Sequence, residues 1–339
     1  MAFGLATFLT GFLKLRSYEA RPPAIRLLMT LGLCFIMLSL FPGLATLPSQ
    51  LISLGEIPGG RIITLLIIAT LSLCLFLIME RGQTERLRQQ LELLVRHQVV
   101  EEFHQRNVSQ RHSEFVLVVV PAFEEADNLK VVLPQIPTAV EGLAVQVLVI
   151  DDGSQDGTAA TARHHGAWVA SHPFRLGGGA ALLTGYELAR KLNPSIIVTM
   201  DGDGQHLPSE IPEVAKPVAA GQADMVIGSR ILGGHKGNSW LRHLGVISYS
   251  RLINLLMGTK ITDCTSGFRS FRRAILDEVR LEESQYHTTE MIIEVAKNGL
   301  RIREQPISFS RRLSGKSKKG NAFFYGWGVL FIILRTWLR

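Results

Sequence analysis

The chain contains long apolar runs without charge and, further on, short apolar runs separated by polar loops. Two of the long runs, residues 24–41 and 61–79, have about the length that crosses the roughly 30 Å hydrocarbon core of a bilayer. The loop 44–60 between them is nearly free of positive charge. The pattern therefore predicts a transmembrane helical hairpin over residues 24–79.

Positive side chains flank this hairpin on both outer sides. Lysines and arginines gather before the first span and after the second. By the positive-inside rule, we expect both ends of the hairpin, and all that follows it, on the cytoplasmic side. Residues 1–15 are apolar but short, basic residues follow them, and no small-residue cleavage site ends them. We therefore interpret residues 1–23 as an interfacial or marginal membrane segment instead of a cleaved signal peptide.

Residues 80–112 are charged, and their first part lacks proline and shows helical periodicity. Leu87, Leu91, Leu94 and Val95 fall on one face of such a helix. The segment is predicted to be a helical stalk. The apolar stripe predicts packing against the rest of the chain, and packing against a second copy, in a homo-oligomer, is the alternative.

From Glu114 onward, short β-rich runs alternate with helical segments, which is typical of a parallel α/β sheet. The predicted strands are Phe115–Val120, Val145–Ile150, Trp168–Ser171, Ile196–Met200 and Asp224–Ile227. Each run ends in a polar loop that contains glycine or lies close to one. Ligands of open α/β sheets bind at the edge where the strands end. The pattern therefore predicts a nucleotide-binding domain over residues 113–310.

The most informative of these loops follows the fourth strand and reads DGDGQH, residues 201–206. Asp201, Asp203 and Gln205 offer carboxylate and amide oxygens, which suit Mg²⁺ or Mn²⁺. A lightly ligated divalent ion takes its other ligands from water and from the phosphates of a substrate. A solvated Asp/Gly turn without a metal is the alternative interpretation.

The composition and charge of the chain indicate which kinds of partner it binds. The chain is 47% hydrophobic and carries a formal net charge of +7, and the positive charge lies beside the apolar segments. That placement favours a membrane, and no helix-turn-helix, zinc-finger or aromatic RNA-binding pattern supports nucleic acid as a partner. Three scattered cysteines are too few for a disulfide framework.

Several short motifs occur in a fixed order along residues 115–320. They are PAFEE (121–125), DDGSQDGT (151–158), HPFRLGGGAAL (172–182), DGDGQH (201–206), GSR (228–230) and DCTSGFRSFRR (263–273). In this respect the chain resembles family 2 glycosyltransferases of the GT-A fold, and within them the polyprenyl-phosphate sugar synthases typified by dolichyl-phosphate mannose synthase. The resemblance implies a Rossmann-like mixed α/β sheet of the nucleotide-diphospho-sugar transferases, here preceded by the transmembrane hairpin.

The resemblance also implies a reaction. A single sugar, mannose or glucose, would pass from GDP-mannose or UDP-glucose to a polyprenyl (dolichyl or undecaprenyl) phosphate, with inversion and with Mg²⁺ or Mn²⁺. The protein would be integral to a membrane, a bacterial plasma (inner) membrane, with its catalytic domain cytoplasmic. A phosphate monoester has a second pKa of about 6, so the acceptor is already a dianionic nucleophile and needs no strong base.

Two other activities stay open. The first is transfer to a hydroxyl of a glycolipid or polysaccharide, for which Glu290 would be the candidate base. The second is an inactive transferase-fold membrane scaffold. We interpret Glu290 as structural or orienting, because a phosphate acceptor does not require a base.

The resemblance assigns roles to residues of the motifs. Asp203 and Gln205 are expected to ligate the metal directly, while Asp201 contacts the ribose or ligates through water. The residues expected to bind the donor are Pro121, Phe123, Glu125, Asp151, Asp152, Gly177, Gly179 and Asp201. For Asp152, a turn-forming side chain that bonds its own loop is the alternative.

Arginines are expected to bind the acceptor phosphate. Arg230 and Arg242 match the family's positions and, with Asp201 and Asp203, are the predicted catalytic residues. Val246 stands where the family has a serine, so Ser248 is the candidate substitute. Arg312 is expected near the phosphates, with anionic lipid headgroups as its other possible partner.

The C-terminal part completes the prediction. Arg269 lies between two phenylalanines that look like core anchors, so we interpret it as structural. Residues 311–339 are predicted to form a basic juxtamembrane loop and then a helix that lies at the membrane interface.

Overall fold

The computed structural model describes residues 60–107, 114–234, 240–283, 285–314 and 322–339, together with a few single positions before residue 60. The side chains of residues 240–242 and 322–325 lie outside this description. The chain divides into two compact units, residues 1–90 and 91–339.

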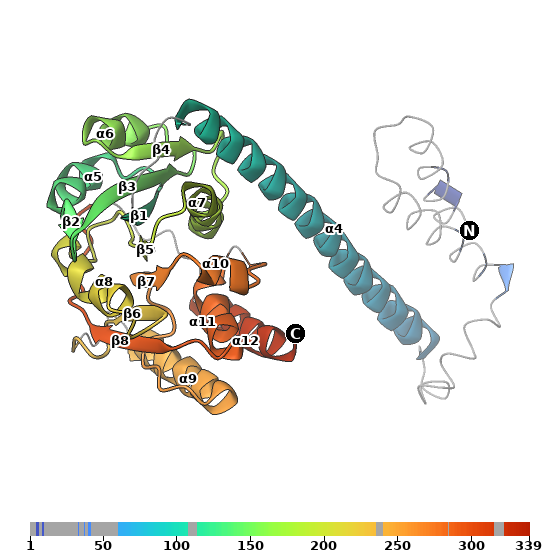
Figure 1. Ribbon diagram of the computed structural model, residues 1–339. Coiled ribbons are helices and arrows are strands. Elements are labelled where there is room, and N and C mark those ends of the chain that lie inside the picture. Colours follow the sequence, from blue (N-terminus) through green and yellow to red (C-terminus); the bar gives the residue numbers. More distant parts are fainter. Residues whose placement is uncertain are drawn as a thin grey trace. The chain divides into compact units, whose positions relative to one another are not determined.

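The second predicted span and the stalk as far as residue 107 form one uninterrupted helix, α4 (Gly60–Asn107), drawn in blue to teal in Figure 1. Residues 1–23, the first predicted span and the loop after it lie almost wholly outside the described residues. Within the described part of the chain, no helix has the combination of length and apolar character needed to cross a membrane. The hairpin therefore stays a prediction.

The last turns of α4 pack within the unit 91–339, as predicted, but through a different face. Val95, Val99 and Phe103 are buried in the core, and Phe103 makes an edge contact with the Trp168 ring. The predicted stripe is wrong apart from Val95, because Leu94 is 70% exposed and the two leucines before it in the stripe are also exposed. A helix turns about 100° per residue, which places Leu94 opposite Phe103.

Among the described residues, eight strands form one mixed sheet in the order β2-β3-β1-β5-β7-β6-β8, with β4 beside β3. The strands are β1 (Phe115–Ala122), β2 (Ala139–Val140), β3 (Leu143–Asp151), β4 (Trp168–Ser171), β5 (Ile196–Thr199), β6 (Met225–Ser229), β7 (Arg269–Arg272) and β8 (Ile302–Pro306). The five predicted strands are confirmed to within two residues at each end. The added strand β7 runs antiparallel to β5 and β6, which makes the sheet mixed, as the GT-A resemblance implies.

Helices cover both faces of the sheet (Figure 1). One core cluster involves α5 (Ala126–Val132), α6 (Thr158–His164) and α8 (Ile211–Ala219). The other involves the end of α4, α7 (Gly178–Leu192), α9 (Trp240–Met257), α10 (Ile275–Glu278), α11 (His287–Lys297) and α12 (Ala322–Leu338). Successive residues of β1 point into opposite clusters, Val118 into the first and Val119 into the second. A strand buried on both faces explains why its sequence is continuously apolar.

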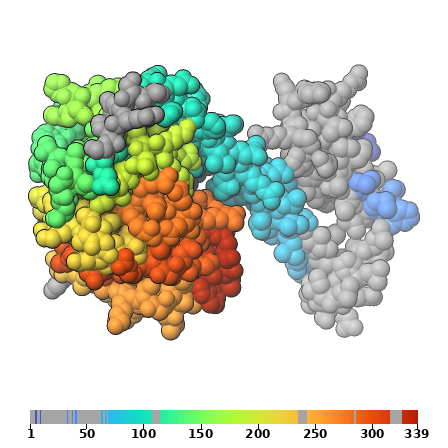
Figure 2. Space-filling model, viewed as in Figure 1, coloured from blue at the N-terminus to red at the C-terminus, as the bar shows by residue number. Residues whose placement is uncertain are grey.

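Helix α12 packs through one face and leaves the other exposed. Val329, Ile332 and Ile333 are buried, and Arg335 pairs with Glu282 and Glu283. The exposed apolar residues of α12 are Trp327, Phe331, Leu334, Trp337 and Leu338. In Figure 2 the orange and red surfaces of the C-terminal segments lie together at one end of the unit 91–339.

Asp224, just before β6, binds one arginine of β7 and one arginine that precedes β8. Its carboxylate accepts hydrogen bonds from Arg301 and Arg272, and the bond from Arg301 foremost lowers the pKa of Asp224 to about 2. A carboxylate with a folded pKa below its unfolded value of 3.8 stabilises the fold above that value. This contribution is lost as the pH falls through about 4 to 2.

We expect Asp224→Asn to lower the free energy of unfolding at pH 7 by about 1 kcal/mol, a value discounted because Arg301 is largely exposed. The difference from wild type should close as the pH falls from 4 to 2. Urea unfolding of the full chain across this pH range measures it, with the exposed Asp127→Asn as control. An undiminished difference at pH 2 would contradict the linkage.

Candidate active site

The loops after β1 and β3 are joined at the edge of the sheet where these strands end. The backbone N–H of Asp152 donates to the carbonyl of Ala122 at 2.8 Å. The Ser154 and Thr158 side chains accept from the backbone N–H groups of Glu124 and Glu125 at 2.8 and 2.9 Å. The PAFEE loop therefore rests on the DDGSQDGT loop, as the predicted nucleoside site requires.

Glu124 has a left-handed backbone, with φ of +53°. Asparagine tolerates this conformation better than glutamate, so a glutamate here needs a fixed hydrogen-bond partner. The hydrogen bond from its N–H to Ser154 holds Glu124 in this conformation.

Asp152 organises the glycine-rich segment that follows β4. Its buried carboxylate accepts hydrogen bonds from the backbone N–H groups of Leu176 and Gly177 at 2.8 and 2.7 Å, and it lies 2.9 Å from His172 Nδ1. Gly153 allows a close crossing here, because a Cβ at this position would approach the Phe174 carbonyl carbon to 2.6 Å. Asp152 thus positions Gly177 at the start of α7, whose first turn contains Gly179.

The acidic loop after β5 holds one buried and one half-exposed carboxylate. Asp203 is buried, whereas the Asp201 side chain is 45% exposed and lies beside Gly267. Burial, and next the charge of Asp201, raise the pKa of Asp203 to about 6. Asp203 also accepts a hydrogen bond from the backbone N–H of Gln205 at 3.0 Å. These two carboxylates and the nearby amide are hard oxygen donors that fit Mg²⁺ or Mn²⁺.

Residues 309–314, here called the strap, cross the acidic loop. The Arg312 guanidinium donates to Asp203 Oδ2 at 2.7 Å and to Glu125 Oε1 at 3.0 Å. The backbone N–H groups of Ser310 and Leu313 donate to the carbonyls of Gln205 and Asp203. A cation of the protein therefore lies on a predicted metal ligand and on a predicted donor-binding residue.

The strap is also fixed at its two ends. The Ser314 hydroxyl donates to Asn128 Oδ1 at 2.7 Å, and Asn128 in turn donates to Glu125. At the other end the Phe309 ring lies 5.2 Å from the His206 ring and 5.2 Å from the Arg230 guanidinium carbon. One segment thus contacts the acidic loop, the PAFEE loop and the GSR motif.

Arg230 is held by Asp263. Its Nε and Nη2 donate to the two oxygens of Asp263 at 2.7 and 2.8 Å, and Nη2 also donates to Thr265 Oγ1 at 2.7 Å. Burial by itself would lower the pKa of Arg230, but the hydrogen bond and the charge of Asp263 raise it, and the charge of Asp201 adds to this. Arg230 therefore stays charged and lies within the electrostatic reach of the acidic loop.

The remaining predicted residues are placed as follows. Pro121 pairs with Ile150 in the register of β1 and β3, Asp151 accepts from the backbone N–H of Ser154, and Phe123 lies under the Arg175 guanidinium at 4.5 Å. The prediction that Arg269 is structural is confirmed, because the buried guanidinium donates to the carbonyls of Ser266, Cys264 and Thr288.

Two acceptor residues of the prediction lie on α9. The side chain of Arg242 is outside the described part of the structure, while Ser248 is exposed. Six residues along an α-helix turn the chain by about 240°, so Ser248 does not share a face with Arg242. This geometry weighs against Ser248 as the substitute for the family's serine.

Sequence reasoning missed Asp263, Glu304 and Asn128 as residues that hold the site. Asp263 opens a motif of the resemblance, and that motif was the signal available for it. Glu304 lies on β8, which the apolar pattern does not predict.

Among the described residues, no group of three or more His, Cys, Asp or Glu side chains is placed to hold a metal ion. A metal here would depend on Gln205, water and substrate oxygens.

The mixed sheet, with carboxylates and arginines at its strand ends, has the GT-A fold. Residues 117–280 match the family described as Glycosyl transferase family 2. The chain is 33% identical over 226 residues to the polyprenol monophosphomannose synthase of Mycolicibacterium smegmatis, which covers 61% of this chain and 82% of that protein. The chain belongs to glycosyl transferase family 2 and is a glycosyltransferase.

A second relative by sequence and a solved structure are also similar to this chain. The undecaprenyl-phosphate mannosyltransferase of Micrococcus luteus is 32% identical, with 60% of this chain and 86% of that protein covered. Glucosyl-3-phosphoglycerate synthase from Mycobacterium tuberculosis, solved with Mn²⁺, UDP and glucosyl-3-phosphoglycerate, is similar with a TM-score of 0.52. It shares 20% identity over 70% of this chain and 83% of that chain, and this likeness supports the fold alone.

Proposed function

We propose that this glycosyltransferase transfers a single hexose, mannose or glucose, from a nucleoside-diphosphate sugar to a polyprenyl phosphate, with inversion, at the cytoplasmic face of a bacterial plasma membrane. The names of its relatives supply the substrate class. The observation that carries the proposal is the strap, which contacts the acidic loop through Arg312 and contacts Arg230 through Phe309. Two arginines beside two carboxylates suit a reaction between two phosphorylated substrates.

The donor would bind at the ends of β1, β3 and β5. Asp201, Asp203 and Gln205 would hold Mg²⁺ or Mn²⁺, and the guanidinium on Asp203 Oδ2 shows that this oxygen accepts a cation. A divalent ion there supplies stabilisation of the negative charge that develops on the departing diphosphate. Glu125 and Asp151 lie on the two joined loops where the nucleoside is expected.

The acceptor would need binding instead of deprotonation. An oxygen of the phosphate dianion attacks the anomeric carbon, the bond from that carbon to the diphosphate breaks, and the nucleoside diphosphate departs with the electron pair. Arg230 can donate a charge-assisted hydrogen bond to the acceptor phosphate, because Asp263 fixes two of its nitrogens and Nη1 has no partner among the described residues. Arg242 is the proposed second phosphate ligand.

The membrane part of the proposal rests on apolar surface. The runs 24–41 and 61–79 are long enough to span a bilayer. Helix α12 exposes Trp327 and Phe331 on one face, and its neighbour α9 exposes Leu255. Aromatic and leucine side chains on one face are typical of helices at a membrane interface. The lipid acceptor would then reach the site without leaving the bilayer.

A donor and acceptor screen tests this function. The full-length protein in detergent is incubated with GDP-mannose or UDP-glucose, a short-chain polyprenyl phosphate, and Mg²⁺, Mn²⁺ or EDTA, and the glycolipid is detected by mass spectrometry. We expect a monoglycosylated polyprenyl phosphate that EDTA abolishes. Product only with a hydroxyl acceptor would favour the alternative transferase, and failure to bind Mn²⁺ or any nucleoside diphosphate would favour the inactive scaffold.

Glu290 separates the phosphate acceptor from the hydroxyl acceptor. Its buried carboxylate accepts hydrogen bonds from the backbone N–H groups of Glu282 and Glu283 and from Arg339, so it is engaged by its own surroundings. We expect Glu290→Gln to keep kcat within about threefold of wild type, because no base is required. Steady-state kinetics with matched thermal melts measure this. A loss of a hundredfold or more in a variant that melts like wild type would revive the hydroxyl alternative.

A further inference from the structure

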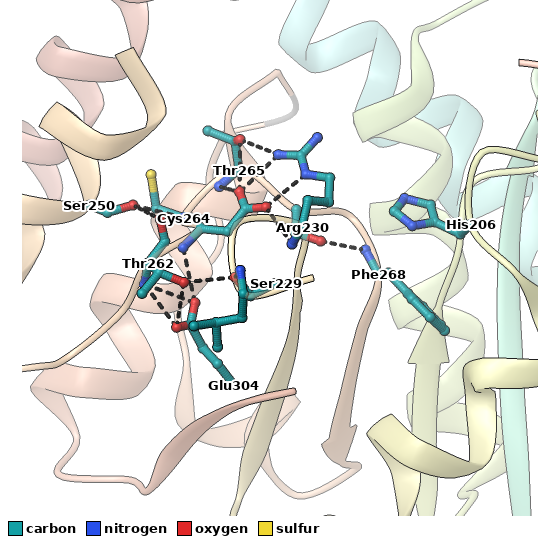
Figure 3. A network of polar contacts seen from close by, with 12 residues as sticks. His206, Ser229, Arg230, Ser250, Thr262, Cys264, Thr265, Phe268 and Glu304 are labelled. Atoms are coloured by element: carbon teal, nitrogen blue, oxygen red, sulfur yellow. Dashed lines mark hydrogen bonds and ion pairs between the residues drawn. The ribbon is translucent and has the colours of Figure 1, made fainter. Parts of the chain in front are cut away.

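A network of buried and partly buried polar groups lies beside Arg230 (Figure 3). At its base is Glu304 of β8, whose two oxygens both accept from the backbone N–H of Thr262 at 2.9 Å. One of these oxygens also accepts from the N–H of Asp263 at 3.0 Å, and the other from the Thr262 hydroxyl at 2.8 Å. A single carboxylate therefore holds two successive backbone N–H groups of one loop.

The same loop, residues 261–265, is held from its other side by α9. The Ser250 hydroxyl donates to the carbonyl of Thr262 at 3.0 Å and accepts from the N–H of Cys264 at 3.1 Å. The Asn254 side chain donates to the carbonyl of Ile261 and accepts from its N–H, both at 2.8 Å. We call residues 261–265 the clamp loop. Its backbone is thus fixed by β8 on one side and by α9 on the other.

The clamp loop determines where Arg230 points. Asp263, which has no exposed surface, accepts from Nε and Nη2 of Arg230, and one of its oxygens also accepts from the Arg230 backbone N–H at 3.2 Å. The Thr262 hydroxyl lies 2.7 Å from the hydroxyl of Ser229, the residue before Arg230. Any shift of the clamp loop would therefore move the guanidinium.

Glutamate at position 304 is partly buried, and its carboxylate depends on the hydrogen bonds that it accepts. It puts a second carboxylate next to the buried Asp263, to whose N–H it is bonded, and a buried charge is unfavourable unless it is fully hydrogen-bonded. Glutamine has one acceptor oxygen and an NH₂ group, so it cannot accept from all the donors that Glu304 serves.

We propose that Glu304 is a positioning residue for sugar transfer: it holds the clamp loop so that Asp263 presents the Arg230 guanidinium to the acceptor phosphate. This inference rests on the proposed function in one respect, namely that the acceptor is a phosphate. Glu304 touches neither substrate. Its effect passes through Asp263, and it should be specific to the acceptor.

Kinetics with the full-length protein test this role. We expect Glu304→Gln to raise KM for a short-chain polyprenyl phosphate about tenfold, while kcat at saturating acceptor and KM for the donor stay within about threefold. Because Glu304 acts through Asp263, the double variant with Asp263→Asn should be no worse than Asp263→Asn alone. The matched control is Glu294→Gln, because Glu294 is a buried glutamate that also accepts a backbone N–H, from Arg280, outside the site.

The outcomes separate positioning from a merely structural role. Equal losses in donor and acceptor parameters, additive effects with Asp263→Asn, or no change at all would each overturn the proposal. Should Glu304→Gln fail to fold, Thr262→Val removes only the hydroxyl between Glu304 and Ser229. It should raise KM for the acceptor about threefold, and an unchanged KM would overturn the proposal equally.

A readout without turnover keeps this inference distinct from the proposed function. The Nε–H signal of Arg230 in ¹⁵N-arginine NMR, assigned by its loss in Arg230→Lys, should exchange slowly with water because it is bonded to Asp263. In Glu304→Gln we expect its exchange to be at least about tenfold faster, and in Glu294→Gln unchanged. Slow exchange in both variants would overturn the positioning role. Absence of wild-type turnover with every polyprenyl phosphate would instead reject the proposed function.

Discussion

Replacing Arg312 by glutamine is expected to act in opposite directions on metal binding and on turnover. The Arg312 guanidinium lies 2.7 Å from Asp203 Oδ2, so it would compete with a divalent ion for this predicted ligand. Removing it should tighten Mn²⁺ binding about three- to tenfold. The same change removes a cation from the proposed phosphate-binding site, so kcat should fall about a hundredfold.

The pH of the binding measurement matters for this comparison. The charge of Arg312 lowers the pKa of Asp203, which burial nevertheless raises to about 6. Without Arg312 the pKa of Asp203 rises further, and protons would then compete with Mn²⁺ near neutrality. Titration followed by Mn²⁺ electron paramagnetic resonance at pH 8 keeps the carboxylate ionised in both proteins.

The neighbouring Arg311 provides a matched control, because it is exposed and lies one residue before Arg312. We expect Arg311→Gln to leave both Mn²⁺ affinity and kcat close to wild type. Weaker Mn²⁺ binding by Arg312→Gln at pH 8 would contradict competition between Arg312 and the metal for Asp203. Full turnover in that variant would contradict a role of Arg312 at the substrate phosphate.

Asp203→Asn should abolish sugar transfer while making the ligand-free protein more stable. An amide in place of the buried carboxylate weakens Mn²⁺ binding and removes the charge that holds the ion, so kcat should fall at least about a thousandfold. A raised carboxylate pKa means that ionising Asp203 in the folded state is unfavourable. The variant lacks that penalty.

The stability effect has a definite pH dependence. The folded pKa of Asp203 is about 6 and the reference value is 3.8, so wild type loses stability relative to the variant as the pH rises through this interval. We expect Asp203→Asn to be more stable by about 1 to 3 kcal/mol at pH 8 without metal, and equally stable at pH 3.5. Urea unfolding at the two pH values measures the difference.

The exposed pair of Asp127 with Lys130 supplies the control, since Asp127→Asn should change neither turnover nor the pH dependence of stability. If Asp203→Asn retained wild-type rates, the metal assignment of the acidic loop would be wrong. If it were destabilised equally at both pH values, Asp203 would serve the fold and not the chemistry.

Much of this site could be predicted from the sequence. Alternation of apolar runs with glycine-containing loops predicted five strands, because a buried parallel strand must be continuously apolar. The carboxyl ends of such strands meet at one edge of the sheet, so the order of the motifs was enough to place Glu125, Asp151 and Asp203 in one site. The residue types then indicated an anionic substrate and a divalent ion.

Other parts could not be predicted from local pattern. Strand β8 consists of Ile-Arg-Glu-Gln-Pro, which has too little apolar character to indicate a strand. The segment is a strand because it pairs with β6. The stripe on α4 was assigned to the wrong face, because both faces of that helix carry leucines or valines. Which face packs depends on the sheet that it meets, and on partners such as the Arg96 pair with Glu187.

The sequence by itself determined the class of chemistry, because oxygen ligands, glycine loops and arginines are chemical properties of residues that persist in any arrangement. Only the tertiary structure decided which charges meet. The contacts of Arg312 with Asp203 and of Asp263 with Arg230 join residues 109 and 33 positions apart, and Glu304 reaches a loop 42 residues before it. Distances of this kind are set by the packing of β8, α9 and the strap against the sheet.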